Sequence, residues 1–257
     1  MGLLSQLKQK YKTLSIVGMA KNAGKTTALN YLIEEAMDDG VVLGITSTGR
    51  DGESTDLVTG TDKPRVFLDV GTIVSVPVKL YDLADAGLEI LRMTNYSTAL
   101  GQIMLCRVAE SGYVQIAGPV NTKDHKKMCR EMLAYGAEIV LIDGAIDRKS
   151  IAAPDTSDAI ILSTGAVLSR SMKKVVAETA HIVGLYQLPE LEDGSVRDLI
   201  CSGQEQEKIM LIKGNRREIL DLKTGLTAGK YLDEAIDDET DFIYIPGALT
   251  SSVISDI

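Results

Sequence analysis

The feature that most constrains the fold is the stretch from Ser15 to Asn30, S-I-V-G-M-A-K-N-A-G-K-T-T-A-L-N. An apolar strand runs into a Gly-Lys-Thr turn, and the residues after the turn have the spacing of an amphipathic helix that stops at Gly40. Such a turn presents backbone N–H groups and the positive end of a helix at one point. Lys25 and Thr26 are the residue types that hold terminal phosphates and a bound Mg²⁺. The stretch therefore predicts a phosphate-binding loop.

The predicted loop is one residue longer than the common phosphate-loop pattern. Met19 stands where that pattern has its first glycine, and Gly18 stands one residue earlier, so the spacing is G-x5-G-K-T. This spacing resembles the loops of dethiobiotin synthetases and of cobyrinate amidating ligases. The alternative interpretation is a glycine-rich turn that carries a surface lysine. The residues expected to contact a nucleotide are Gly18, Lys21, Asn22, Ala23, Gly24, Lys25, Thr26 and Thr27.

Composition limits the classes of partner. The 257-residue chain has a formal net charge of −9, which argues against affinity for nucleic acid or anionic membranes because both need clustered positive charge. No stretch approaches the length of a membrane span. The three cysteines are widely spaced and form no C-x-x-C pair, so neither a disulfide framework nor a zinc site is indicated. We expect a soluble, cytoplasmic protein.

Strand-like apolar runs alternate with helical runs, which favours a mostly parallel sheet covered on both faces. We expect an α/β chain with the three-layer fold of P-loop NTPases, a β-rich middle segment and a small C-terminal α/β appendage. Hairpin connections are predicted at 95–101 and 213–217. A polar break at 188–194 divides the chain into a nucleotide-binding domain, residues 1–190, and the appendage, residues 191–257. A predicted helix begins close to residue 257, which leaves open a native continuation past it.

A second chemical feature is Asp143, which follows four apolar residues at the end of a predicted core strand. In a P-loop fold this strand lies beside the strand that enters the phosphate loop, so Thr26 and Asp143 would both reach a bound Mg²⁺. Arg148 follows where an open α/β sheet has its ligand crevice. It either stabilises developing phosphate charge or is a solvated loop charge.

The third feature is the loop after the second predicted core strand, S-T-G-R-D-G-E-S-T-D. It resembles a switch segment in which Asp51 could hold Mg²⁺, and Asp51 or Glu53 could orient the attacking water. A plain acidic surface loop is the alternative. A weaker candidate is the exit of the fourth core strand, which could contact the base or sugar of a nucleotide. Its residues are Ser163, Thr164 and Gly165.

Two other patterns do not support a function. N-T-K-D at 121–124 is similar to the guanine-reading N-K-x-D of GTPases, but its lysine stands one place late and the segment precedes the Asp143 strand. Guanine specificity is therefore not predicted. His125 and His181 both fall in predicted helices without ligand-spaced partners, so we expect solvated side chains rather than catalytic or metal-binding ones.

Several longer segments carry a more specific resemblance. They are K-Y-K-T-L-S-I-V-G-M-A-K-N-A-G-K-T-T, G-I-T-S-T-G-R-D-G-E-S-T-D-L-V-T, S-G-Y-V-Q-I-A-G-P, L-I-D-G-A-I-D-R-K-S and I-L-S-T-G-A-V-L-S-R. Together they resemble the small P-loop subunit of the lysine 5,6-aminomutase reactivase, from Lys10 to about Gly247, a family associated with anaerobic lysine fermentation. The resemblance implies an ATP-dependent molecular chaperone that acts with a larger MutS-like subunit to release damaged cobalamin from the aminomutase. No recognisable cobalamin-binding motif is present in the sequence.

The residues and the resemblance together predict an ATPase that uses phosphoryl chemistry as a conformational switch, with ATP and Mg²⁺ as cofactors. The candidate catalytic residues are Lys25, Asp51, Glu53 and Arg148. Two alternatives stay open: an ATP-dependent ligase of the dethiobiotin synthetase type, which phosphorylates a small carboxylic acid, and a nucleotide sensor that does not hydrolyse ATP. The resemblance implies a MutS-like subunit and a cobalamin-dependent aminomutase as partners, and homo-oligomerisation stays open.

Overall fold

The computed structural model describes residues 2–48, 65–119, 121–144, 157–189, 191–202, 208–222, 228–246 and 251–256. The chain divides into two compact units, Met1–Gly184 and Leu185–Ile257. The boundary predicted from the polar break lay after residue 190, a few residues later. Within the described ranges, no helix combines the length and the apolar character that crossing a membrane requires.

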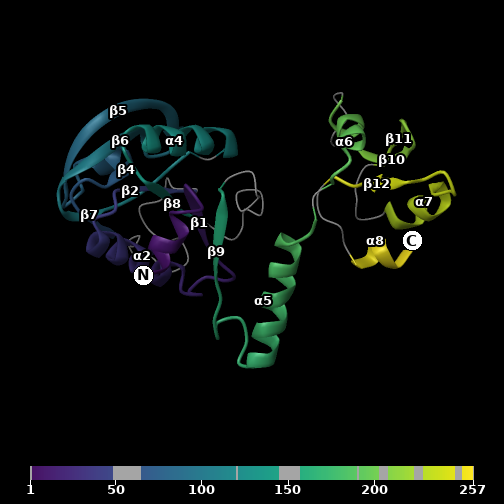
Figure 1. Cartoon of the computed structure of the whole chain (residues 1–257), viewed down its shortest axis with the longest axis horizontal. Coiled ribbons are helices and arrows are strands. Elements are labelled where there is room, and N and C mark those ends of the chain that lie inside the picture. The colour runs from purple at the N-terminus through teal and green to yellow at the C-terminus, as the bar shows by residue number, and fades with distance from the viewer. Residues whose placement is uncertain are drawn as a thin grey trace. The chain divides into compact units, whose positions relative to one another are not determined.

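The first unit is built on a seven-stranded mixed sheet that is mostly parallel (Figure 1). Its strand order is β5-β6-β4-β2-β8-β1-β9. The parallel strands are β1 (Thr13–Gly18), β2 (Leu43–Ser47), β4 (Ile73–Pro77), β8 (Ile139–Asp143) and β9 (Ala159–Ser163), and the antiparallel strands are β5 (Gly87–Thr98) and β6 (Gly101–Glu110). The α/β class and the mostly parallel sheet predicted from the sequence are confirmed.

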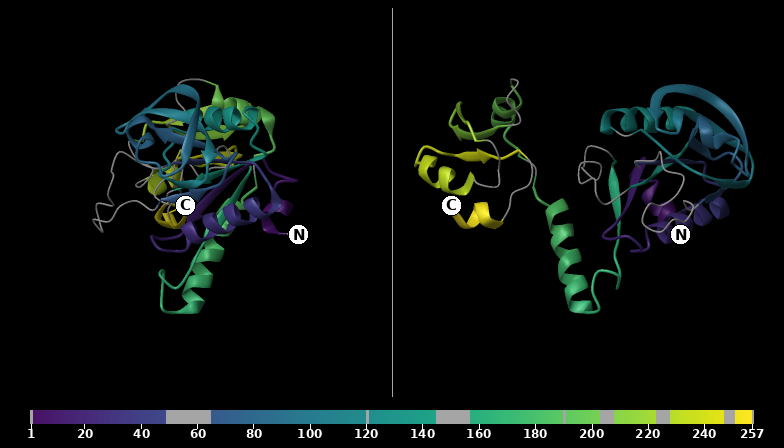
Figure 2. Two further views of the ribbon diagram at one scale, coloured as in Figure 1. Left: turned by 90° about the vertical axis from the view of Figure 1, so that its left-hand side faces the viewer. Right: turned by 180° about the vertical axis from the view of Figure 1, so that it is seen from behind.

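Two helices cover the two faces of this sheet, α2 (Lys25–Asp39) on one face and α4 (Thr122–Ala134) on the other (Figure 1, Figure 2). Successive side chains of a strand point to opposite faces, so the residues of β8 divide between two cores. Leu141 packs in the core that includes the buried side of α2, whereas Val140 and Ile142 pack in the core that includes α4. The sheet is therefore buried on both sides in its central strands.

Local signals fix both ends of α2. The helix begins directly after Gly24, which has a left-handed backbone with φ of 96°. It ends at Gly40, whose φ of 65° lets its N–H cap the last turn through the backbone oxygens of Ala36 and Met37. The apolar stripe that faces the sheet consists of Leu29, Leu32, Ile33 and Ala36. The predicted helix and its stop at Gly40 are both confirmed.

β5 and β6 form a long antiparallel hairpin whose connection differs from the prediction. We expected the connection to span 95–101, but β5 continues to Thr98, which pairs with Gly101. The turn itself is only two residues long. Side chains bond across this end of the ladder: the Thr98 hydroxyl donates to Gly101 O over 3.3 Å, and the Gln102 amide donates to Thr94 O.

The remaining elements of the first unit are short or peripheral. β3 and β7 pair as a separate two-stranded sheet, and the rings of Phe67 and Tyr113 meet edge to face with centroids 5.4 Å apart. Helix α5 ends two residues beyond the boundary between the units and contains no buried residue. The bounds are α1 (Leu3–Leu7), β3 (Val66–Leu68), α3 (Val78–Tyr81), β7 (Gly112–Val114) and α5 (Met172–Tyr186).

The second unit is a small antiparallel sheet of order β11-β10-β12 with helices on both faces. Leu211 of β10 packs against α7 and α8, and Ile212 packs against α6. Lys213 pairs with Arg216, so the turn is two residues long rather than the predicted 213–217, and Gly214 has φ of 54°. The bounds are α6 (Gly194–Cys201), β10 (Ile209–Lys213), β11 (Arg216–Leu220), α7 (Ala228–Ala235), β12 (Phe242–Tyr244) and α8 (Ser251–Asp256).

The three cysteines lie in different environments, two of them buried and one exposed. Cys106 belongs to the core on the α2 side of the sheet, and Cys129 belongs to the core on the α4 side. Burial raises the pKa of both thiols to about 12. Cys201 is exposed at the end of α6 in the second unit.

Candidate functional site

Several of the predicted site residues lie at the carboxyl ends of four neighbouring parallel strands. Strands β2, β8, β1 and β9 are adjacent in that order, so their last residues lie along one edge of the sheet. Asp143 at the end of β8 is in register with Ser47 of β2 and with Ile16 of β1. Gly18 at the end of β1 is in register with Ser163 of β9. Ligand crevices of open α/β sheets form at this edge.

The loop between β1 and α2 contains residues with a left-handed backbone and leads into the N-terminus of α2. Asn22 has a left-handed backbone with φ of 64°, the only such non-glycine residue in the described ranges, and Gly24 follows with φ of 96°. Within the described ranges no side chain caps the first turn of α2, and no acidic residue lies in that turn. The first N–H groups of a helix have no partner within the helix, so this end carries partial positive charge. An anion is the ligand that such an end favours.

Lys25 and Asp143 are in direct contact at this end of the helix. Lys25 Nζ lies 2.7 Å from Asp143 Oδ1, and the side chains are 29% and 28% exposed. The two side chains form an ion pair, and apart from Lys25 the buried Oδ1 has no hydrogen-bond partner within the described ranges. A carboxylate oxygen in that state can still accept a cation or a donor. The structure therefore brings together the two residues on which the phosphate-site prediction most depends.

The exit of β9 lies against the same loop. Met19 donates its N–H to Ser163 O over 2.8 Å, and a Cβ on Gly165 would stand 3.9 Å from Ala23 O. The Thr164 hydroxyl lies 2.9 Å from the Thr179 hydroxyl of α5. Segment 163–165 is therefore adjacent to the loop, as a base or sugar contact would require.

The other predicted site residues have different outcomes. Lys21, Asn22, Thr26 and Thr27 are exposed in the loop and in the first turn of α2, whereas Ala23 is buried. Asp51, Glu53 and Arg148 lie outside the described residues. Among the residues that the structure does describe, no three His, Cys, Asp or Glu side chains gather so that they could hold a metal ion by themselves.

The prediction that His125 is solvated is wrong. Its side chain has no exposed surface, and its Nε2 lies 3.0 Å from the backbone oxygen of Ser47, the last residue of β2. The overlooked signal is periodicity, because His125 precedes Met128, Cys129 and Met132 at the spacing of the buried stripe of α4. His181 is exposed, as expected. A buried imidazole therefore lies at the same strand edge as Asp143.

Burial of His125 makes stability depend on pH. Burial lowers the pKa of this imidazole, and its hydrogen bond to Ser47 opposes the shift to a smaller degree. The unfolded imidazole titrates near 6.5. Protonation therefore favours the unfolded chain, and the free energy of unfolding should fall as the pH drops below about 6.5. Urea unfolding of the wild type and of His125→Gln should show a smaller fall in the variant, and an equal fall in both proteins would contradict this.

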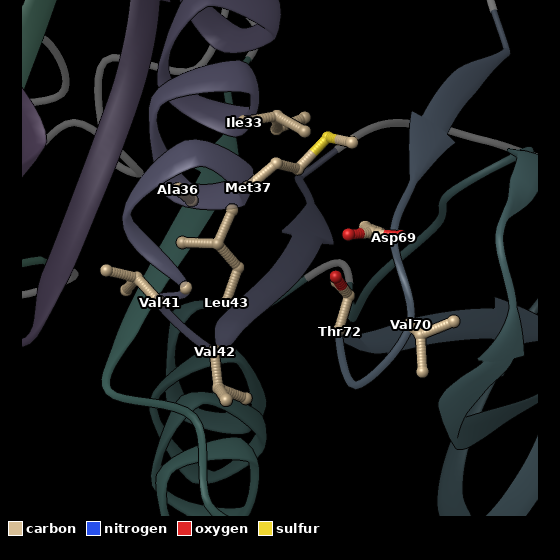
Figure 3. A pocket seen from close by; sticks show the side chains of 10 residues that line it. Ile33, Ala36, Met37, Val41, Val42, Leu43, Asp69, Val70 and Thr72 are labelled. Atoms are coloured by element: carbon tan, nitrogen blue, oxygen red, sulfur yellow. The ribbon is translucent and has the colours of Figure 1, made fainter.

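A cavity of about 110 Å³ lies at the opposite end of the sheet (Figure 3). Its walls come from the end of α2, including Ile33 and Met37, from Leu43 at the start of β2, and from the turn that contains Asp69 and Thr72. Figure 3 shows the Asp69 and Thr72 oxygens directed toward the apolar side chains. Because the cavity is at the amino ends of the parallel strands, it is not part of the candidate phosphate site.

Comparison with known proteins gives no significant match to a family model, a curated protein or a solved structure. The class of the protein therefore follows from its fold, which is an α/β fold with a mostly parallel seven-stranded mixed sheet. Its candidate site is defined by the loop from Gly18 to Gly24, the ion pair of Lys25 with Asp143, and the strand ends around them.

Proposed function

We propose that this chain binds and hydrolyses ATP·Mg²⁺ with the fold and phosphate site of a P-loop NTPase. The observation that carries the proposal is the 2.7 Å contact between Lys25 Nζ and Asp143 Oδ1, made at an uncapped helix N-terminus. A lysine and a carboxylate at that position match the requirements of a triphosphate and its metal ion. The longer G-x5-G-K-T spacing leaves both groups at the same strand edge.

The residues at this edge have distinct proposed roles. Lys25 would bind the β- and γ-phosphates, and Thr26 and Asp143 would be ligands of Mg²⁺. Asp143 fits that role because its Oδ1, apart from the ion pair with Lys25, has no hydrogen-bond partner in the described part of the chain, and Thr26 is exposed in the first turn of α2. When bound, Mg²⁺ neutralises phosphate charge and orients the phosphates. The proposed roles of Asp51 or Glu53 in orienting water and of Arg148 in stabilising charge depend on the sequence alone.

The biological role that we propose is that of the ATPase subunit of a reactivating chaperone. This part depends on the resemblance to the small reactivase subunit, which extends from Lys10 to about Gly247. ATP turnover would alter a surface that a MutS-like subunit recognises, so that damaged cobalamin leaves a lysine 5,6-aminomutase. Co-purification of an aminomutase or a MutS-like protein with this chain from a lysine-fermenting anaerobe would support it, and their absence would count against it.

Calorimetry of the purified chain with ATP, with and without Mg²⁺, tests the phosphate site directly. We expect a measurable heat of binding, and we expect the affinity to increase when Mg²⁺ is added. The absence of heat in both conditions would refute the site. The ligase alternative keeps support from its similar loop spacing. A screen of small carboxylic acids for faster ADP release separates the two, because only a ligase would respond to an acid substrate.

A further inference from the structure

His125 makes a hydrogen bond whose direction can be assigned. It lies in the first turn of α4, and its Nε2 is 3.0 Å from the backbone oxygen of Ser47. A carbonyl oxygen only accepts, so Nε2 must carry the ring proton and donate it. Nδ1 is then an acceptor, and it is buried without a hydrogen-bond partner within the described ranges.

The acceptor belongs to a peptide group that also contacts Asp143. Thr48 donates its N–H to the backbone oxygen of Asp143 over 2.9 Å, and the Thr48 hydroxyl lies 3.4 Å from the same oxygen. The carbonyl of Ser47 and the N–H of Thr48 are the two ends of one planar peptide unit. His125 therefore bonds one end of this unit, and the other end bonds the backbone of Asp143.

The surroundings enclose this peptide. A Cβ on Gly118 would stand 2.3 Å from Ser47 O and 3.3 Å from His125 Nε2, so the Gly118 backbone packs directly against the contact. The preceding residue is held in turn, because Ser75 Oγ donates to Ala117 O over 2.6 Å. Among the described residues, the Gly118 backbone therefore limits the space in which another donor could reach the Ser47 oxygen if the imidazole is removed.

The unpartnered Nδ1 argues against a role in packing alone. A buried polar atom without a partner costs about 1–3 kcal/mol. An apolar side chain of similar size would pack beside Met128 and Cys129 without that cost. The imidazole is therefore explained by what its other nitrogen does, which is to fix the Ser47 carbonyl.

We propose that His125 is a positioning residue that holds Asp143 in place for Mg²⁺ by fixing the Ser47–Thr48 peptide. The inference depends on the proposed function, because it takes Asp143 as a metal ligand. His125 itself touches neither metal nor nucleotide. Its removal should therefore lower the gain in ATP affinity that Mg²⁺ provides.

Two variants of His125 place an amide donor at different distances from the backbone. In His125→Gln the amide nitrogen is as many bonds from Cβ as Nε2, whereas in His125→Asn it matches Nδ1. Calorimetry gives the ATP dissociation constant with and without Mg²⁺. The readout is the constant without Mg²⁺ divided by the constant with Mg²⁺, which is the gain in affinity that the metal provides. We expect the ratio to fall about tenfold or more in His125→Asn, as for groups that orient metal ligands. His125→Gln should keep most of it, and His181→Asn, at an exposed histidine, should keep all of it.

The outcomes separate this inference from the proposed function. The inference is overturned if folded His125→Asn keeps the wild-type gain in affinity from Mg²⁺, or if His125→Asn and His125→Gln lose equal parts of that gain. Either result leaves the proposed function intact. Failure of the wild-type chain to bind ATP overturns the proposed function, and the inference with it. Thermal melting checks folding, and if His125→Asn lacks a cooperative transition, His125→Phe replaces it under the same criteria, since it keeps a ring and lacks a donor.

Discussion

Lys25→Ala should abolish ATP turnover and weaken ATP binding by about 100-fold or more, which is the scale of losing one charge contact to a reacting group. Lys25 is the only lysine that the structure, in its described ranges, shows in contact with Asp143. The fold should persist, because the side chain is 29% exposed and such an ion pair contributes at most about 1 kcal/mol. Phosphate release and calorimetry measure the two effects, and circular dichroism measures the fold.

Lys10→Ala is the matched control for this variant. Lys10 is exposed and lies outside the strand edge that carries the site, so its removal changes the net charge equally without touching the phosphate loop. Turnover in the control should equal that of the wild type. Wild-type turnover in Lys25→Ala would remove the phosphate-site assignment.

Asp143→Asn should strengthen ATP binding in the absence of Mg²⁺ and reduce the gain in affinity that Mg²⁺ provides. Without Mg²⁺, the carboxylate holds Lys25 Nζ at 2.7 Å and repels the phosphates, so the amide should tighten Mg²⁺-free ATP binding by about fivefold, equivalent to about 1 kcal/mol. With Mg²⁺, the variant lacks a charged ligand, so the gain from the metal should largely disappear and turnover should fall about 100-fold. Calorimetry with and without Mg²⁺ measures both changes in one protein.

The control for this variant is Asp82→Asn, which removes one exposed carboxylate at the end of α3 in the same unit. It should leave both affinities unchanged. If Asp143→Asn kept the wild-type Mg²⁺-free affinity and the wild-type gain from Mg²⁺, Asp143 would not be the metal ligand and the ion pair with Lys25 would have another role.

The parts of the fold that could be predicted from the sequence are those set by local signals. The strand before Gly18, helix α2 and the stop at Gly40 follow from apolar periodicity and from glycine, and these signals act over a few residues. The hairpin before Gly101 was placed wrongly because residues 95–98 continue the strand, with Ser97 paired to Gln102 and Thr98 to Gly101, and such pairing involves residues beyond the turn. Helices α1 and α3 have five and four residues, too few to show a periodic pattern.

The candidate site was predictable where a strand end determines it. Asp143 and Gly18 lie at the carboxyl edge because each ends a parallel core strand, and the adjacency of β1 and β8 brings Lys25 within reach of Asp143. His125 was assigned to solvent because a lone histidine in a polar helix usually faces water. The spacing to Met128, Cys129 and Met132 indicates its burial, but its hydrogen bond to Ser47 and its contact with Gly118 are tertiary and could not be predicted.

The burial of two of the three thiols leaves one exposed cysteine at which a probe can be attached. Cys106 and Cys129 are buried with their pKa raised to about 12, so at neutral pH they are protonated and shielded from alkylating reagents. Cys201, on α6, is exposed. A maleimide fluorophore would therefore label the native sequence at one position in the second unit, and its fluorescence could be recorded during an ATP titration without engineering the chain.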